Sequence, residues 1–298
     1  MNCNDFLDLV NQRLGPAMLP EVRADLLQLA AYDVGRMERN PWFWVLPAVQ
    51  NLLQPQETKT VINLAPFMAA WGFLYAATIR LDQIQDHDPV DDPLPTNQTA
   101  AQYNLLLAYS VLASSILDQL SADDFPARRL LRLRRFWSDM LLRMASGQQR
   151  DLTAAHPVLA PDTLDYYEEL ARAKTGAAFA LAFGGVATLL SDDSALIERI
   201  ILVGEIFGLL VQYGDDLSDA ANQPNRTVTF TSAFQYFAQT WPRNQAEPTP
   251  VTFWSTIYQV YCAFVQQLLT DYPTSLQHSV AALFAQAFVP LTTEEQLA

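Results

Sequence analysis

Basic residues are scarce in this 298-residue chain, and lysine is nearly absent. The formal net charge is −14, which disfavours binding to nucleic acids and to anionic lipid surfaces because both carry negative charge. The only lysines are Lys59 and Lys174, and Lys174 lies beside an apolar stretch, so it is a candidate for a specific role. One arginine-rich helix face is expected to be solvated or paired with acidic side chains; it consists of Arg128, Arg129, Arg132, Arg135 and Arg143.

The chain also contains little cysteine and little glycine. Its two cysteines, Cys3 and Cys262, form neither a closely spaced pair nor a zinc-binding pattern, which favours a reducing compartment. The 10 glycines are few for a protein with many tight turns, and the 18 prolines gather between apolar segments. No signal peptide pattern opens the chain, and the longest apolar runs, 65–79 and 177–190, are shorter than the roughly 20 residues of a membrane-spanning helix. We therefore expect a cytoplasmic protein without a transmembrane segment.

Apolar residues recur at helical spacing along most of the chain, and no segment shows convincing strand alternation. Half of the residues are hydrophobic, so the chain is able to bury a large core. The sequence predicts an all-α protein in which residues 1–298 form a single large helical bundle. Helices are expected at 5–32 (two helices), 42–53, 60–86, 100–120, 126–152, 162–190, 194–220, 230–240, 250–271 and 274–290.

Two pairs of carboxylates stand near the ends of long apolar helices. Asp82 and Asp86 are four residues apart, so they share one helix face. The negative end of the helix dipole makes that placement unfavourable unless a cation lies between them. Asp215 and Asp219 repeat the spacing on another helix, with Asp216 adjacent. Oxygen ligands of this kind suit Mg²⁺, which keeps several waters and shares phosphate oxygens with a substrate.

A single acidic helix end would be an ordinary surface feature, but two of them follow almost wholly apolar helices. This combination suggests an apolar cavity with metal ions at its mouth, which suits a molecule with a hydrocarbon tail and a diphosphate head. The loop at 87–98, which follows the first pair, contains three prolines and three aspartates. It is interpreted as a solvated linker or as a lid.

Four segments resemble, in order, the motifs of the trans-prenyl diphosphate synthases and their class I terpene synthase relatives. The first aspartate-rich motif has Gln83 at its second aspartate, and the second such motif has Val211 at its leading phenylalanine, so the chain resembles a divergent member. The segments are 82–86 (DQIQD, like DDxxD), 147–152 (GQQRDL, like GQxxDL), 174–176 (KTG, after the tyrosine-bearing 166–168) and 211–219 (VQYGDDLSD, like FQxxDDxxD).

The resemblance implies a helical bundle around a deep apolar cavity, in which three Mg²⁺ ions bridge the diphosphate of an allylic prenyl substrate. It also implies a homodimer, because relatives are commonly dimers. The implied metal ligands are Asp82, Asp86, Asp215, Asp216 and Asp219; the substrate-binding residues are Lys174, Gln212, Gln148 and Arg226; and the catalytic residues are Asp82, Asp86, Lys174 and Asp215.

The cavity wall is expected to carry aromatic and small side chains. Residues one and two turns before Asp82 would point into it, and small side chains there leave room for a chain of about twenty carbons. Aromatic faces stabilise a cation by about 0.5–2 kcal/mol each, although each ring could equally be core packing. The expected lining residues are Trp71, Tyr75, Thr78, Phe179, Phe183 and Phe207.

The basic residues with which chain-elongating relatives bind isopentenyl diphosphate are missing. Their GKRxRP segment corresponds to RMERNP at 36–41, and no lysine or arginine lies between Arg80 and Arg128. An acidic surface does not hold a second diphosphate without cations. The first hypothesis is therefore a terpene synthase that ionises and cyclises one allylic diphosphate. The alternatives are a prenyltransferase with an unusual acceptor and a non-catalytic subunit of a prenyl synthase.

Overall fold

The structure, a computed structural model, describes residues 3–15, 18–37, 44–54, 62–85, 98–120, 124–154, 164–222, 228–242 and 245–288. Within these ranges all regular elements are helical and no strand is present, which confirms the predicted all-α class. The chain divides into two compact units: unit 1 comprises Met1–Asn51 and Pro55–Arg132, and unit 2 comprises Leu52–Gln54 and Leu133–Ala298. That residues 1–298 form a single domain stays a prediction.

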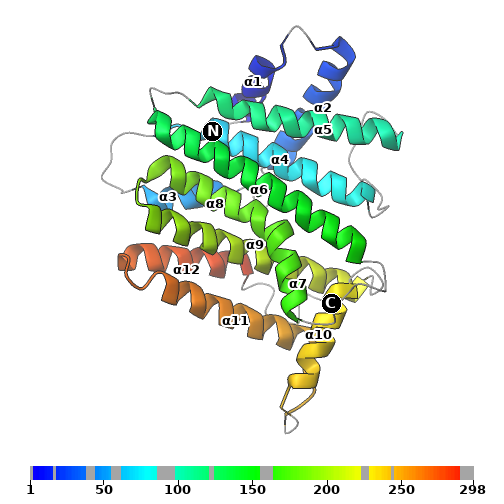
Figure 1. The fold of residues 1–298 in the computed structure, drawn as a ribbon, viewed down its shortest axis with the longest axis vertical. Coiled ribbons are helices and arrows are strands. Elements are labelled where there is room, and N and C mark those ends of the chain that lie inside the picture. The colour runs from blue at the N-terminus through cyan, green and yellow to red at the C-terminus, as the bar shows by residue number, and fades with distance from the viewer. Residues whose placement is uncertain are drawn as a thin grey trace. The chain divides into compact units, whose positions relative to one another are not determined.

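Unit 1 is built around α4, a helix that is buried on nearly every side. All residues from 66 to 75 are buried, which explains why this helix carries no polar stripe. α4 packs along α5, and α1 and α2 contact both of these helices (Figure 1). The elements are α1 (Cys3–Arg13), α2 (Pro20–Met37), α3 (Val45–Leu53), α4 (Ala65–Gln85), α5 (Thr99–Ile116), the 3-10 turn η2 (Leu117–Gln119) and the first turns of α6 (Ala127–Ala154).

A buried ion pair lies in the core of unit 1. Arg80 of α4 donates two hydrogen bonds to Asp33 of α2, one of them at 3.0 Å, and Tyr109 of α5 donates to Asp33 Oδ2 at 2.6 Å. Arg80 is 1% exposed and Asp33 is 4% exposed. Burial and the neighbouring Asp33 raise the pKa of Tyr109 well above its usual value, so its hydroxyl remains a donor. The triad ties α2, α4 and α5 together two residues before Asp82.

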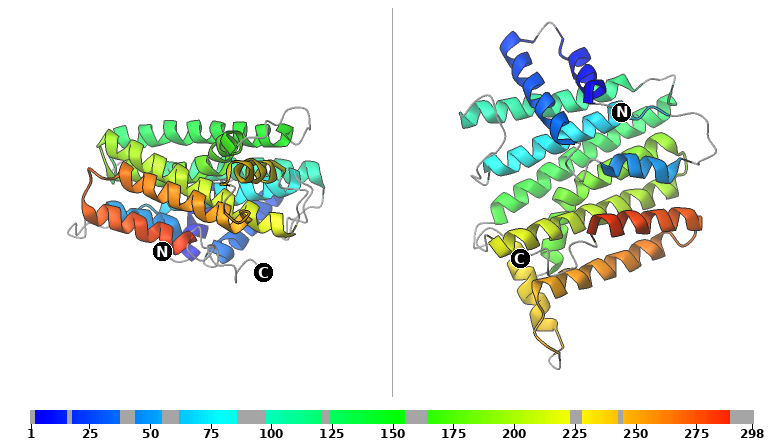
Figure 2. Two further views of the ribbon diagram at one scale, coloured as in Figure 1. Left: turned by 90° about the horizontal axis from the view of Figure 1, so that it is seen from below. Right: turned by 180° about the vertical axis from the view of Figure 1, so that it is seen from behind.

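Unit 2 contains the longest helices of the chain. α7 runs through a π-helical turn into α8, and α8 packs along α9 (Figure 1). α11 and α12 pair with each other and contact α9, as both views of Figure 2 show. The elements are the rest of α6, α7 (Leu164–Ala171), η3 (Arg172–Gly176), α8 (Ala177–Leu190), α9 (Ser194–Asn222), α10 (Val228–Thr240), α11 (Pro250–Leu268) and α12 (Thr274–Phe288).

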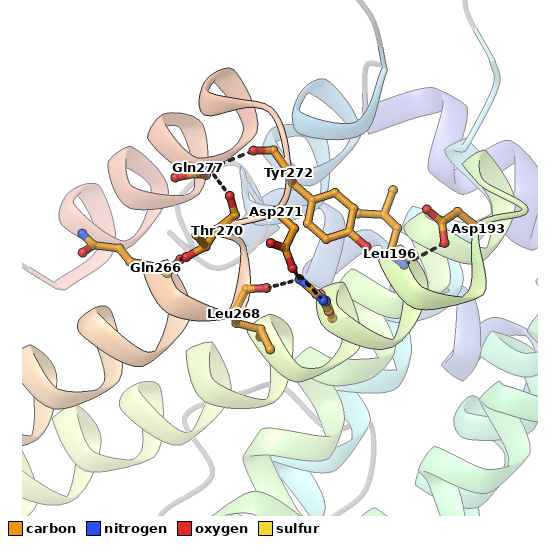
Figure 3. A network of polar contacts seen from close by, with 9 residues as sticks. Asp193, Leu196, Gln266, Leu268, Thr270, Asp271, Tyr272 and Gln277 are labelled. Atoms are coloured by element: carbon orange, nitrogen blue, oxygen red, sulfur yellow. Dashed lines mark hydrogen bonds and ion pairs between the residues drawn. The ribbon is translucent and has the colours of Figure 1, made fainter.

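Local polar groups set where these helices begin and end. Asp193 Oδ1 accepts hydrogen bonds from the backbone N–H groups of Ala195 and Leu196 and so caps the start of α9. Close to this cap, Arg199 of α9 donates to the Leu268 carbonyl at 2.7 Å and pairs with Asp271 at 3.4 Å (Figure 3). A cation at these last carbonyls is favourable for α11, and the contact holds the α11–α12 turn against α9.

An aromatic cluster fills the core of unit 2. The ring of Phe207 lies 4.9–5.5 Å, between centroids, from the rings of Phe179, Phe183, Phe284 and Phe288. All five side chains are at most 1% exposed, so they contribute to the packed interior. That Phe179, Phe183 and Phe207 also line a substrate cavity stays a prediction.

Two described helical segments, Thr99–Gln119 and Leu164–Leu190, are long and apolar enough to cross a membrane by length and composition alone. The most apolar window of Leu164–Leu190 is 78% buried within the protein, as in a core helix, and that of Thr99–Gln119 is 39% buried. Core helices of this length pass the same test, so it is weak evidence for a membrane span. The expected cytoplasmic location stays a prediction.

Candidate active site

The second aspartate-rich motif lies on the C-terminal part of α9. Asp215 and Asp219 are exposed, whereas Asp216 is half-buried. Among the described residues, no basic side chain forms an ion pair with Asp215 or Asp219. Within the described ranges, Asp215 and Asp219 therefore carry negative charge without an ion-paired arginine or lysine, whereas the charge of Lys174 acts on Asp216.

Desolvation by the surrounding protein raises the pKa of all three carboxyl groups. Although Asp215 is accessible to water, desolvation by the surrounding protein raises its pKa to about 7, and the charges of Asp216 and Asp219 add to the effect. Burial raises the pKa of Asp216 to about 6, against the lowering effects of its hydrogen bonds and of Lys174. Desolvation also raises the pKa of Asp219. Carboxylates whose charge is this unfavourable fit a site that receives a cation, and an all-oxygen ligand set fits Mg²⁺.

A chain of hydrogen bonds orients Asp216. Tyr167 of α7 donates to Asp216 Oδ2 at 2.6 Å, and Gln212 donates to Asp216 Oδ1 at 3.0 Å. The Gln212 amide oxygen accepts in turn from the Thr175 hydroxyl. Burial and nearby Asp216 raise the pKa of Tyr167 well above its usual value, so the phenol remains a donor. The chain connects α7, α9 and the π turn η3.

The π turn presents three polar residues, Arg172, Lys174 and Thr175, to different partners. Lys174 Nζ lies 2.9 Å from Asp151 Oδ2 on α6, Thr175 bonds Gln212, and Arg172 donates to Glu205 at 3.0 Å. A π turn contains one residue more than an α turn, and such turns are frequent at functional sites. The sequence predicts a continuous helix at 162–190 and carries no recognisable signal for this turn.

Two glycines allow neighbouring helices to approach the π turn closely. A Cβ on Gly147 of α6 would lie 2.6 Å from the carbonyl carbon of Ala173 and 2.7 Å from the backbone nitrogen of Lys174. A Cβ on Gly208 of α9 would lie 2.5 Å from the Thr175 carbonyl oxygen. Because the opposing atoms are backbone, they cannot swing away, and only glycine fits. Gly147 is the first residue of the GQxxDL-like segment, and this contact accounts for its identity.

A second polar network joins the π turn to α6, α9 and α11. Glu205 lies between two guanidinium groups, 2.6 Å from Arg143 and 3.0 Å from Arg172. Arg172 Nη2 also donates to the Tyr261 hydroxyl oxygen at 3.0 Å, and the Tyr261 hydroxyl donates in turn to Glu168. Burial raises the pKa of Glu205, but the two arginines more than offset this and the pKa is lowered. Arg143 is thus paired with an acidic residue, one of the two expected outcomes for the arginine-rich face.

The first aspartate-rich motif belongs to unit 1. Asp82 is half-buried in the last turn of α4, whereas Asp86 lies outside the described residues. Two and three turns earlier, Tyr75 and Trp71 stack with ring centroids 5.1 Å apart, and one turn earlier the Thr78 hydroxyl donates to the Tyr75 carbonyl of its own helix. Trp71 and Tyr75 are buried and Thr78 is half-buried. That these three residues line a substrate cavity stays a prediction.

The structure brings together some of the predicted site residues in unit 2, whereas others lie outside the described residues. In unit 2, Lys174 lies close enough to Asp216 for its charge to lower the pKa of that carboxyl, and Gln212 bonds Asp216 directly. Gln148 is half-buried on α6, and Arg226 lies outside the described residues. Across the described ranges, no group of three or more His, Cys, Asp or Glu side chains is arranged to hold a metal. Mg²⁺ needs fewer protein ligands when a diphosphate supplies oxygens, and Asp86 lies outside the described residues.

Sequence reasoning gave no role to two residues of this site. Asp151, the partner of Lys174, enters the sequence analysis only through the GQxxDL-like segment, and Tyr167 only through the tyrosine-bearing segment before KTG. Asp151 follows Gln148 by three residues, and Tyr167 precedes Lys174 by seven. Nothing in the sequence indicates which side chains Asp151 and Tyr167 contact.

The family model for polyprenyl synthetase matches residues 43–242. The chain belongs to the polyprenyl synthetase family. The match includes both aspartate-rich motifs, the GQxxDL-like segment and the KTG segment, so the predicted membership in the prenyl diphosphate synthase superfamily is confirmed. No curated protein sequence matches the chain.

Several solved structures of polyprenyl synthetase relatives are similar to the chain over nearly its whole length. A geranyltransferase from Helicobacter pylori, complexed with magnesium and isoprenyl diphosphate, matches with a TM-score of 0.70 at 13% identity, covering 96% of this chain and 95% of its own. The geranylgeranyl pyrophosphate synthetase from Pyrococcus horikoshii matches at 0.68 and 14%, covering 98% and 94%. The geranyltranstransferase from Thermotoga maritima matches at 0.64 and 15%, covering 97% and 96%. At these identities the likeness establishes the fold.

Proposed function

We propose that this member of the polyprenyl synthetase family is a magnesium-dependent prenyltransferase that transfers the allylic group of a prenyl diphosphate to an acceptor. The observation that carries the proposal is the position of Lys174 on the π turn η3, next to the second aspartate-rich motif. The residue after it, Thr175, donates a hydrogen bond to Gln212, and Gln212 donates to Asp216 of that motif. The ammonium group of Lys174, the carboxylates of the second motif and the amide of Gln212 are thus connected by hydrogen bonds and by neighbouring positions in the chain. All of them lie inside the segment that matches the family.

Each proposed residue has a distinct task in this reaction. By the family resemblance, three Mg²⁺ ions would be held by the carboxylates of the two aspartate-rich motifs: Asp82, Asp86, Asp215, Asp216 and Asp219. When bound, Mg²⁺ would neutralise the negative charge that develops on the diphosphate as it leaves. Lys174 would exchange its ion pair with Asp151 for a diphosphate oxygen and stabilise the same charge. The carbon–oxygen bond breaks with both electrons leaving on the diphosphate, the acceptor adds to the allylic cation, and a proton is lost from the adduct.

The sequence analysis placed cyclisation first, and the comparisons favour the transfer alternative. The matching family is that of polyprenyl synthetases, and the three similar structures are two geranyl-group transferases and one geranylgeranyl pyrophosphate synthetase. Cyclisation is the second candidate, because one observation favours it: no lysine or arginine lies between Arg80 and Arg128 to bind a second diphosphate. Because these basic residues are missing, we also propose that the acceptor is a molecule other than isopentenyl diphosphate.

Product analysis distinguishes these functions. The full chain is incubated with C10, C15 and C20 allylic diphosphates and Mg²⁺, with and without isopentenyl diphosphate, and with excess chelator as control. Transfer predicts a longer prenyl product that requires Mg²⁺ and an acceptor; where isopentenyl diphosphate gives no such product, the assay is repeated with acceptors that carry no diphosphate. Cyclisation predicts a hydrocarbon or alcohol without any acceptor. If no substrate releases diphosphate in a Mg²⁺-dependent way, the enzyme proposal is wrong and the non-catalytic subunit is favoured.

We also propose that the protein forms a homodimer through α5. Tyr103, Leu107 and Val111 follow one another at intervals of four residues, so they form one stripe on this helix. Their exposed fractions are 38%, 63% and 61%, which is high for large apolar side chains. An apolar stripe of this kind is suited to a second copy of the same helix, because a symmetric dimer buries the same patch on both subunits.

A further inference from the structure

Tyr167 is a buried tyrosine for which the proposed reaction has no direct use. It lies on α7, is 2% exposed, and packs its ring against Tyr213 and Phe230 at centroid distances of 4.7 and 6.0 Å. Phenylalanine would fill the same space. The hydroxyl, however, donates at 2.6 Å to the carboxylate of Asp216, and hydrogen bonds to a charged acceptor are about twice as strong as neutral ones.

The bond from Tyr167 completes the engagement of Asp216. One carboxylate oxygen accepts from Tyr167 and the other from Gln212, whose amide oxygen accepts from Thr175. With a donor at each oxygen, the carboxylate plane is fixed, and with a partner at each end, the Gln212 amide is fixed too. Two residues of the second aspartate-rich motif therefore have their orientation set from α7 and from the π turn.

We infer that Tyr167 is a positioning residue for the second aspartate-rich motif. By holding Asp216 and, through it, Gln212, it arranges the oxygen atoms that meet Mg²⁺ and diphosphate before either of them binds. The inference rests on the proposed function and extends it to a residue that touches neither metal nor substrate. Groups that orient metal ligands in this way typically contribute about 10–100-fold to metal affinity or activity.

Tyr213 provides a matched control within the same aromatic cluster. It is fully buried, its ring packs directly against that of Tyr167, and its hydroxyl is also a hydrogen-bond donor. That hydroxyl donates to Glu168 at 3.1 Å, not to a carboxylate of the motif. Tyr167→Phe and Tyr213→Phe therefore remove the same atom from neighbouring rings, but only the first one deprives Asp216 of a donor.

The experiment measures Mg²⁺ binding by calorimetry on the full chain in the presence of inorganic pyrophosphate, with circular dichroism to verify folding. Tyr167→Phe should raise the Mg²⁺ concentration needed for half-saturation by about 10-fold or more. Tyr213→Phe should leave that concentration unchanged, even if it lowers the melting temperature. Turnover of an allylic diphosphate, measured against Mg²⁺ concentration, should show the same displacement for Tyr167→Phe alone.

The outcomes separate this inference from the proposed function. If wild type binds Mg²⁺ with pyrophosphate and Tyr167→Phe binds it equally well, or if both variants weaken binding alike, the positioning role is refuted and the proposed function stands. If wild type shows no such binding, the proposed function fails and the inference fails with it. Should Tyr167→Phe not fold, Thr175→Val removes the hydroxyl at the opposite end of the chain with little change of shape; the same weakening is expected, and unchanged binding overturns the inference.

Discussion

Replacing Arg80 with leucine should cost unit 1 a large part of its stability. The substitution removes the cation and two of the three hydrogen bonds that Asp33 receives, and leaves a carboxylate at a position that is 4% exposed. Breaking one side of a buried ion pair costs about 3–5 kcal/mol. A folded protein is stable by only about 5–15 kcal/mol, so this single change removes a substantial fraction.

The same reasoning predicts that removing every polar member of the triad is far less harmful. Arg80→Leu/Asp33→Leu/Tyr109→Phe removes both charges and the phenol hydroxyl of the triad together, and replacing a buried ion pair with apolar residues is often neutral or stabilising. Urea denaturation followed by circular dichroism gives the free energy of unfolding of wild type, the single variant and the triple variant. The argument is refuted if Arg80→Leu lies within about 1 kcal/mol of wild type, or if the triple variant is as unstable as the single one.

Four further predictions follow from the site and the surface. Lys174→Gln should reduce turnover about 10²–10³-fold, measured by diphosphate release, whereas Lys59→Gln, which changes the only other lysine, should not. Gly208→Ala should destabilise the folded protein by about 1–3 kcal/mol in thermal unfolding, because its Cβ meets the Thr175 carbonyl. Gly35→Ala in α2 is the control: a Cβ there meets nothing within 4 Å, so the folded protein should be stabilised by about 0.5–1 kcal/mol. Glu205→Gln should be destabilised at pH 7 and approach wild type in acid, because the lowered pKa makes the charged form stabilising only above it. Leu107→Asp should yield monomers in light scattering, while Val260→Asp, 57% exposed on α11, should not.

The helices were predictable because their signals are local. Gly15 and Pro20 separate α1 from α2, and Pro250 follows the capping residue Thr249 at the start of α11. Periodicity alone located nearly every other helix to within a few residues. Which helices pack against one another was not predictable. The spacing of apolar residues identifies the buried face of a helix, but it does not identify the helix that covers this face.

The candidate site was predictable as a set of motifs and not as a set of contacts. The spacing of Asp215 and Asp219 fixes a shared helix face, and the rarity of lysine singles out Lys174. Their neighbours depend on long-range packing: Asp151 and Tyr167 reach Lys174 and Asp216 across 23 and 49 residues of chain. A buried arginine two residues before Asp82 also gave no sign in the sequence that its partner was Asp33.

The π turn has a consequence for how the long segment Leu164–Leu190 responds to change. Each residue of an α-helix turns the chain by about 100°, so the one extra residue of η3 offsets the angular phase of α7 from that of α8 by about that amount. Tyr167 and Phe179 are therefore oriented as they would be on two separate helices joined without a loop. Deleting one residue from the turn would restore a regular helix, rotate Tyr167 away from Asp216 and leave α8 in place. The length of this segment, and not only the identity of its residues, therefore determines which side chains meet the second aspartate-rich motif.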